Sequence, residues 1–180
     1  MDNALEELVG NQDAAAPPPQ RLLEFVLPMV IVAIDQATKA MVRASVPVHD
    51  SVVVIPGFFN ITHALNSGAA FGILDGADFP FKTAIIAVIA TAALIGVGMY
   101  AASLAHHQRV ARIGLALIVG GAAGNLIDRV LAGSVVDFAD FYWRSYHFWA
   151  FNVADSAISI GVTMLILDML TTGPHVSKTV

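Results

Sequence analysis

The sequence contains no cysteine and few charged residues. Without cysteine, neither a disulfide framework nor a cysteine nucleophile is available. Charged residues make up only 13% of the 180 residues and hydrophobic residues make up 57%, which is far more apolar than an average soluble domain. The chain also lacks the clustered lysine and arginine of a nucleic-acid-binding protein and the H-E-x-x-H spacing of a zinc enzyme. The composition therefore predicts an integral membrane protein whose chemistry depends on other side chains.

Four long apolar segments predict four transmembrane helices. The clearest segment, Thr83–Ala105, contains neither charged residues nor histidine, and at ~1.5 Å per residue it is long enough to cross the ~30 Å hydrocarbon core. Four spans and their loops would use almost the whole chain, so we expect one membrane domain. The predicted parts are an acidic, proline-rich N-terminal tail (1–20), a four-span domain (21–172) with spans at 22–41, 83–105, 113–131 and 151–171, and a C-terminal tail (173–180).

Two segments between the spans differ in composition from the spans. Residues 46–80 contain β-branched and aromatic runs broken by Pro56 and Gly57, which predicts short strands joined by turns. Residues 133–149 are rich in aromatic residues, which indicates an interfacial loop or a short helix lying on the membrane. The predicted fold class is an all-α membrane protein with four transmembrane helices, a small extracytoplasmic sheet and a short interfacial helix.

The loop between the second and third spans is basic. It carries His106, His107, Arg109 and Arg112, and short basic loops tend to stay in the cytoplasm. This orientation places both termini in the cytoplasm. The predicted sheet and the aromatic segment then face outward.

Two acidic residues are predicted at the outer ends of the third and fourth spans. Asp137 follows the third span and Asp155 lies in the first turn of the fourth, so both should reach the outer interface at a similar depth. Two carboxyl groups held close together do not both ionise readily, so one can keep its proton while the other stays charged. Such a pair can activate water and protonate the leaving amine in peptide hydrolysis. An equally open alternative is that each aspartate caps a helix or pairs with Arg129.

Further polar residues lie close to this pair in the predicted spans. Asn125, Asp128 and Arg129 have the i, i+3, i+4 spacing of one helical face. Asn152 and Asp155 repeat the i, i+3 relation. These residues form either a polar clamp between helices or a shell that orients the aspartates and donates to a substrate backbone. The third span also has small residues at every fourth position, which would let another helix approach closely: Ala116, Gly120 and Gly124.

Three further groups of polar residues could have either a structural or a catalytic role. Asp35 and Lys39, spaced i and i+4 in the first span, are expected to form a structural ion pair. Asn66 lies next to small residues, where its amide could hold a peptide carbonyl or simply form a turn. A Ser–Lys protease would need a serine beside Lys39; Ser45 and Ser67 are candidates, but no surrounding pattern singles out either.

Five short blocks occur in order between and within the predicted spans: DQATK (35–39), NSGAAFG (66–72), GNLIDR (124–129), VVDF (135–138) and FNVADS (151–156). Each block alone is a weak signal, whereas five in this order are specific. Together they resemble the bacterial lipoprotein signal peptidases, signal peptidase II. The resemblance covers about residues 22–171.

The resemblance implies an aspartic endopeptidase that cuts the signal peptide from a prolipoprotein, just before a cysteine that bears diacylglycerol. We expect a monomer without metal or organic cofactor in the bacterial cytoplasmic (inner) membrane, with its active site near the outer face. Its partners would be the diacylglyceryl-prolipoprotein substrate and membrane lipid. Asp137 and Asp155 match the catalytic pair of the family. Substrate-binding or supporting positions are matched by Asn66, Gly68, Asn125, Arg129, Asn152, Asp128, Asp35 and Lys39.

A non-enzymatic membrane protein is the alternative to this hydrolase. In a small proton-linked transporter, Asp128, Asp137 and Asp155 would form a relay and lie at different depths in the bilayer. The peptidase hypothesis instead places Asp137 and Asp155 at one level near the outer face. The relative positions of the three carboxylates therefore separate the two hypotheses.

Overall fold

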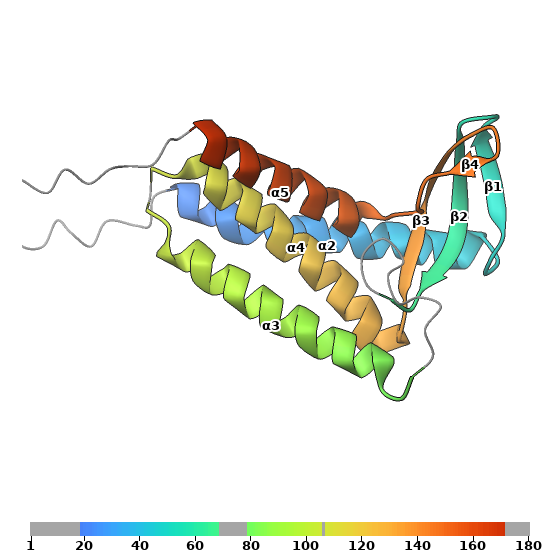
Figure 1. The fold of residues 1–180 in the computed structure, drawn as a ribbon, viewed down its shortest axis with the longest axis horizontal. Helices are drawn as coiled ribbons and strands as arrows, with labels where there is room; N and C mark the ends of the chain where they lie inside the picture. The colour runs from blue at the N-terminus through green and yellow to red at the C-terminus, as the bar shows by residue number, and fades with distance from the viewer. Residues whose placement is uncertain (1–18, 69–78, 106, 172–180) are drawn as a thin grey trace, which may run out of the picture.

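Four long helices and a small antiparallel sheet make up the computed structural model, which describes residues 19–68, 79–105 and 107–171 (Figure 1). The helices are α2 (Pro19–Ser45), α3 (Lys82–Ser103), α4 (Arg109–Ala132) and α5 (Val153–Thr171). Each is long and apolar enough to cross a membrane, so the four predicted spans are confirmed. α2 begins at Pro19, inside the predicted N-terminal tail, and the rest of that tail and the C-terminal tail lie outside the described residues.

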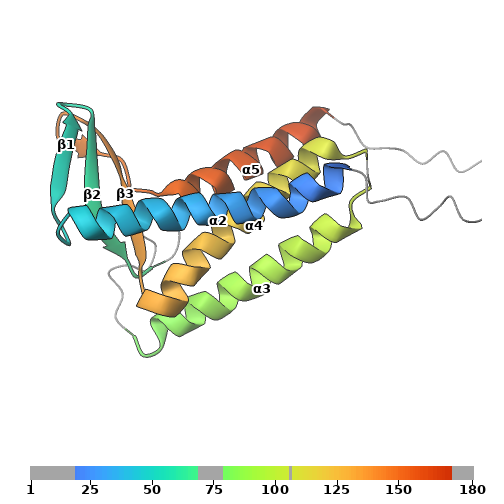
Figure 2. The ribbon, with the colours of Figure 1, turned by 180° about the vertical axis from the view of Figure 1, so that it is seen from behind.

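The central helix of the bundle is α4, which packs against α2, α3 and α5 (Figure 2). Small residues permit this packing. A Cβ atom added to Gly121 would collide with the carbonyl oxygen of Ala154 in α5, and one added to Gly120 would meet the backbone of α2 at 2.9 Å. A Cβ atom on Gly124 would lie 2.6 Å from Asp35 Oδ2. The predicted close approach of a helix is thus confirmed at Gly120 and Gly124.

The described ends of the chain lie at the end of the bundle opposite the sheet. The start of α2, the end of α5 and the connection between α3 and α4 are all found there (Figure 1 and Figure 2). Arg112 in α4 forms an ion pair with Glu24 in α2 and donates a hydrogen bond to the carbonyl of Leu104, just after α3, at 3.2 Å. These contacts hold three helices together at this end.

The sheet has the strand order β1 (Ser51–Ile55), β2 (Phe59–Asn66), β3 (Val135–Trp143) and β4 (Tyr146–His147), with antiparallel neighbours. It packs on the end of α2 through an apolar cluster of Val42, Val46 and Val136. The predicted sheet in residues 46–80 is confirmed as β1 and β2, while residues 69–78 lie outside the described part of the chain. Pairing of β3 with β2 places Asp137 opposite Ala64.

The prediction of an interfacial helix in residues 133–149 is wrong, because this segment forms β3 and β4. β-branched and aromatic residues dominate the segment, and such residues favour strands. Its backbone groups also find partners in this form, since the N–H of Ala139 donates to the carbonyl of Phe151 at 2.8 Å and β3 pairs with β2. Phe141 packs against Phe59, with ring centroids 4.6 Å apart. A strand therefore leads from α4 toward α5.

Candidate active site

Asp137 and Asp155 meet at the end of the bundle that carries the sheet. Asp137 lies in β3 and is only 4% exposed, and Asp155 lies in the first turn of α5. Asn152, just before α5, contacts both aspartates. Its side-chain Nδ2 donates to Asp137 Oδ1 at 2.6 Å, and its backbone N–H donates to Asp155 Oδ2 at 3.2 Å. One asparagine thus joins the two carboxylates in a single polar site.

Asp155 also caps the helix in which it lies. The N–H of Asp155 donates to Asn152 Oδ1 at 2.9 Å, while the N–H of Asn152 donates back to Asp155 Oδ2, which is the reciprocal pattern of a capping box. The other carboxylate oxygen of Asp155 accepts a hydrogen bond from Asn125 Nδ2 at 2.8 Å. The capping alternative is therefore correct for Asp155, but capping uses only one of its two oxygens.

Arg129 contacts backbone carbonyls instead of the aspartates. Its guanidinium donates to the carbonyl of Gly68 at 2.8 Å and to that of Asn125 at 3.3 Å. Among the residues that the structure describes, no ion pair joins Arg129 to Asp137 or Asp155. The alternative in which Arg129 pairs with an aspartate is thus not found, and Arg129 anchors the chain that follows β2.

Asn66 at the end of β2 donates to the second oxygen of Asp137. The bond from Asn66 Nδ2 to Asp137 Oδ2 is 3.0 Å long, and Asn66 Oδ1 accepts the N–H of Gly68 at 2.9 Å. The turn predicted around Asn66 is therefore present, and the same amide orients Asp137. Contact with a substrate stays a prediction for Asn66. The rest of its block, residues 69–72, lies outside the described residues.

A fully buried ion cluster centred on Lys39 adjoins the two aspartates. Lys39 Nζ lies 2.8 Å from Asp35 Oδ2 and 2.9 Å from Asp128 Oδ2, and none of the three side chains is more than 1% exposed. The predicted ion pair between Asp35 and Lys39 is confirmed. Asp35 Oδ1 also accepts the N–H of Ala154 at the start of α5, at 3.0 Å. Because buried charges are stable only when paired, this cluster ties α2, α4 and α5 together.

Gln36 and Arg43, which contact Asp128 of this cluster from partly exposed positions, have no counterpart among the predicted site residues. Gln36 Nε2 donates to Asp128 Oδ1 at 3.2 Å, and Arg43 Nη2 lies 2.7 Å from the same oxygen. A signal for Arg43 is present in the sequence, since Asp35, Lys39 and Arg43 follow one another at every fourth position and so share one helical face. That face of α2 points toward α4.

Burial raises the pKa of Asp137 to about 7, and the nearby charge of Asp155 contributes to the rise. Hydrogen bonds from Asn66 and Asn152 and the charge of Lys39 act in the opposite direction on this pKa. An ordinary aspartate is fully ionised at neutral pH. Asp137, in contrast, can hold a proton there and can serve as an acid.

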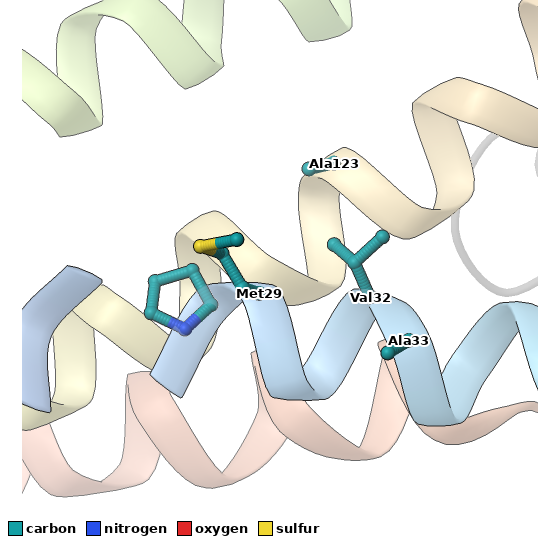
Figure 3. Close-up of a pocket in the computed structure, with 5 residues that line it drawn as sticks. Met29, Val32, Ala33 and Ala123 are labelled. Carbon is teal, nitrogen blue, oxygen red and sulfur yellow. The ribbon is translucent and has the colours of Figure 1, made fainter. Parts of the chain in front are cut away.

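An open apolar groove of about 370 Å³ lies between α2 and α4, where Val32 of α2 points toward Ala123 of α4 (Figure 3). None of its lining residues carries a titratable group, so it is not a place for hydrolytic chemistry. The lining residues are Pro28, Met29, Val32, Ala33 and Ala123. Within the described ranges, no cluster of three His, Cys, Asp or Glu side chains is arranged to hold a metal ion.

Residues 27–171 match a family model described as signal peptidase (SPase) II. A lipoprotein signal peptidase of Solibacter usitatus (strain Ellin6076) is 46% identical over 156 residues, covering 85% of this chain and 93% of that protein. A lipoprotein signal peptidase of Geobacter metallireducens (strain ATCC 53774 / DSM 7210 / GS-15) is 44% identical over 155 residues, with the same 85% and 93% coverage. The matched region contains the five sequence blocks and both aspartates.

Two solved structures, each described as a bacterial membrane enzyme structure by the in meso method, share the fold. The structure at 2.3 Å resolution superposes with a TM-score of 0.75 at 36% identity, covering 87% of this chain and 93% of that chain. The structure at 1.9 Å resolution has a TM-score of 0.74 at 33% identity, covering 83% of this chain and 94% of that chain. Since the family match runs from α2 to the end of α5 and the relatives align over nearly their whole length, this chain belongs to the signal peptidase II family.

Proposed function

We propose that this chain is an aspartic endopeptidase that removes the signal peptide from diacylglyceryl-modified prolipoproteins. The observation that carries the proposal is the pair formed by the buried Asp137 and the half-buried Asp155, joined through Asn152. The name of the relatives, lipoprotein signal peptidase, supports the class of substrate. Cleavage just before the lipid-bearing cysteine is the position that the family resemblance implies.

In the proposed reaction, Asp155 is ionised and Asp137 carries a proton. Asp155 takes a proton from water as the water oxygen attacks the carbonyl carbon of the scissile peptide bond, and Asp137 protonates the carbonyl oxygen. When the C–N bond breaks, the leaving nitrogen takes the proton held by Asp155. Asp137 regains its proton from the hydroxyl of the tetrahedral intermediate. Both carboxyl groups then return to their starting states, and no covalent intermediate forms.

The surrounding residues have two proposed roles. One group orients the aspartates, because its amides or charges contact them directly or through a neighbour. The other group surrounds the end of β2, where Arg129 of α4 donates to the Gly68 carbonyl and so fixes the backbone at Gly68 for contact with a substrate backbone. The orienting residues are Asn125, Asn152, Asp128, Asp35 and Lys39, and the proposed substrate-binding residues are Asn66, Gly68 and Arg129.

The proposed position of the site in the membrane follows from charge and lipid chemistry. The basic residues Arg109 and Arg112 lie in the first turn of α4, which begins at the end of the bundle opposite the sheet (Figure 1). Basic residues at the ends of membrane spans favour the cytoplasm. The sheet and the aspartates then lie near the outer face of the cytoplasmic membrane. A diacylated substrate could reach this site by lateral diffusion while its acyl chains stay in hydrocarbon, and a monomer is sufficient for this reaction.

The arrangement of the carboxylates supports the peptidase over the proton relay. Asp128 Oδ2 accepts the N–H of Val136 at 3.4 Å, and Val136 directly precedes Asp137. Asp137 and Asp155 share Asn152. All three carboxylates therefore gather at one end of the bundle, whereas a relay would need them at different depths.

Cleavage is expected to depend on the lipid of the substrate. The purified protein in mixed micelles should cleave a diacylglyceryl-modified precursor at least about 100-fold faster than the same precursor without the lipid, because the acyl chains supply binding energy that positions the peptide. The measurement is the initial rate of signal-peptide release from both precursors. Equal rates would contradict the proposed substrate class, and release at another bond would contradict the proposed cleavage position.

Cleavage is also expected to decline as the pH rises through about 7, because Asp137 must hold a proton to act as the acid. The rate should fall about tenfold for each pH unit above this range, as expected for the loss of one essential proton. The measurement is kcat/KM for the lipidated precursor across neutral and alkaline pH. An acid of ordinary pKa would lose its proton near pH ~4, so a rate that stays constant from about pH 6 to about pH 8.5 would contradict the role of Asp137.

One contact favours a second type of hydrolase, since Lys82 Nζ donates to Ser67 Oγ at 2.9 Å. The alternative Ser–Lys arrangement around Lys39 is not found, because Ser45 bonds to the Met41 carbonyl and Lys39 bonds to acids and an amide. Under the aspartic mechanism, the Ser67 hydroxyl is not a reacting group, so Ser67→Ala should lose far less kcat than Asp137→Asn or Asp155→Asn. A loss comparable to that of the aspartate variants would favour a serine nucleophile.

A further inference from the structure

Lys39 is a buried cation whose ammonium group donates three hydrogen bonds, each to a side-chain oxygen. Its ammonium contacts Asp35 Oδ2 at 2.8 Å, Asp128 Oδ2 at 2.9 Å and Asn125 Oδ1 at 2.9 Å. An ammonium has three donors and no acceptor, so this set uses all of them. Two of the partners neutralise charge. The third, Asn125, is a neutral amide that leads to Asp155.

The ammonium fixes which way the Asn125 amide points. Because Lys39 can only donate, the amide must present its oxygen to Lys39, and Asn152 Nδ2 donates to the same oxygen at 3.1 Å. The amide nitrogen of Asn125 then faces Asp155 Oδ1 at 2.8 Å. A reversed amide would place an NH₂ group against the ammonium and a carbonyl oxygen against the carboxylate. Both contacts would be repulsive, so only one orientation is stable.

A second path runs from Lys39 to the same part of α5. Asp35, which is paired with Lys39, accepts the N–H of Ala154 at 3.0 Å through its other oxygen. Ala154 directly precedes Asp155 in the first turn of the helix. Lys39 is thus linked both to the carboxylate of Asp155 and to the backbone that carries it.

We propose that Lys39 is a positioning residue which, through Asn125, keeps both oxygens of Asp155 supplied with donors and so holds Asp155 ionised as the base of the pair. This proposal rests on the proposed function. The donors on Asp155 are Asn125 Nδ2 and the backbone N–H of Asn152. Hydrogen bonds to a carboxylate favour its charged form, and a position in the first turn of a helix does the same.

Arg43 supplies a matched control for Lys39. It lies one helical turn further along α2 and contacts the same acid, with Arg43 Nη2 2.7 Å from Asp128 Oδ1. Its hydrogen bonds within the described residues do not include Asn125. Loss of Arg43 therefore removes a cation from Asp128 without releasing the amide. The charged groups that act on Asp155 from the elements packed around it are Lys39 and Asp35 of α2, Arg129 of α4 and Asp137 of β3.

The test compares the pH dependence of cleavage by Lys39→Met and Arg43→Met. In Lys39→Met the oxygen of Asn125 keeps only the donor from Asn152, so the amide is held less firmly toward Asp155; the acidic limb of kcat/KM should move upward by about one pH unit or more, and cleavage near neutral pH should fall. In Arg43→Met the acidic limb should stay in place. The proposal is overturned if the acidic limb of Lys39→Met coincides with that of the parent, or if Arg43→Met shifts it equally.

Two further comparisons keep the test decisive. Asn125→Ala should shift the acidic limb in the same direction as Lys39→Met, and the shift of the double variant should be smaller than the sum of the two single shifts, because both changes weaken the same hydrogen bond to Asp155; fully additive shifts would overturn the proposal. If Lys39→Met does not fold, Asp128→Asn and the double variant Lys39→Met, Asp128→Asn are compared instead, with the same expected shift and the same contrary result.

Normal cleavage by Asp155→Asn would reject the proposed function itself, whereas an inactive Asp155→Asn with an unshifted Lys39→Met would reject only the role of Lys39.

Discussion

Asp155→Asn and Asp137→Asn are each expected to lower kcat for cleavage of a lipidated precursor by at least about 10³-fold, within the range that an essential proton-transfer group supplies. An amide has nearly the shape of the carboxyl group but can neither take a proton from water nor return one to the leaving nitrogen. The measurement is single-turnover cleavage by purified variants in mixed micelles. Their thermal unfolding is followed in parallel to show that they are folded.

Asp140→Asn is the matched control for these two variants. Asp140 lies in β3 three residues after Asp137, and it is also buried. Its carboxylate contacts Asn60 at 3.1 Å and His147 at 2.9 Å, in the sheet instead of the aspartate pair. Asp140→Asn should therefore lose far less kcat than Asp137→Asn or Asp155→Asn. Equal loss in all three variants would show that burial of an acid in this strand, not catalysis, explains the effect.

Gly121→Ala is expected to lower both the stability of the bundle and its activity. The added Cβ would collide with the carbonyl oxygen of Ala154 and lie 2.8 Å from Ile158 Cγ1, so α5 must move away from α4. Overpacking of this kind costs about 1–3 kcal/mol of folding free energy. The shift also separates Asn125 from Asp155, and misplacement of a reacting group by about 1 Å can cost about 100-fold in rate. Thermal unfolding in detergent and the cleavage rate measure the two effects.

Gly98→Ala provides the comparison for Gly121→Ala. Gly98 lies in α3, and a Cβ added there meets no atom within 4 Å. Alanine has a higher helix propensity than glycine by about 1 kcal/mol, so this variant should be as stable as the parent or more stable, with unchanged cleavage. If Gly121→Ala behaved in the same way, the close contact between α4 and α5 would not be what positions Asp155.

The membrane helices could be predicted from the sequence for a physical reason. In hydrocarbon a chain must satisfy its own backbone hydrogen bonds, so a long apolar segment has essentially one solution, the helix. α3 accordingly begins at Lys82, beside the predicted start of its span. The ion pair of Asp35 and Lys39 could also be predicted, because it depends only on the spacing of the two residues within one helix.

The segment 133–149 shows why the outer region is harder to predict. Aromatic residues at an interface suit a helix lying on the membrane and also a strand. The choice depends on a partner that is distant in sequence, since Asn66 and Asp137 are 71 residues apart along the chain. No local pattern within residues 133–149 indicates that this segment will pair with the edge of β2.

The site could be predicted in part. The spacing of Asp137 and Asp155 around one connection indicates that both lie at the same end of the bundle, and their contacts with Asn152 agree with this. The orientation of the two carboxylates could not be predicted from the sequence, because it depends on packing between helices. Lys39 reaches Asn125 across 86 residues of sequence. Such contacts arise only when small residues let α4 approach its neighbours, and the identity of the contacting side chains cannot be read from either helix alone.

The most direct test of the aspartate pair is a structure of this protein with a lipidated peptide in which a secondary hydroxyl replaces the scissile carbonyl. That hydroxyl stands in for the tetrahedral intermediate. We predict that its oxygen lies within hydrogen-bonding distance, about 2.6–3.2 Å, of a carboxylate oxygen of both Asp137 and Asp155. A hydroxyl that contacts neither aspartate, or that lies against Ser67, would contradict the aspartic mechanism.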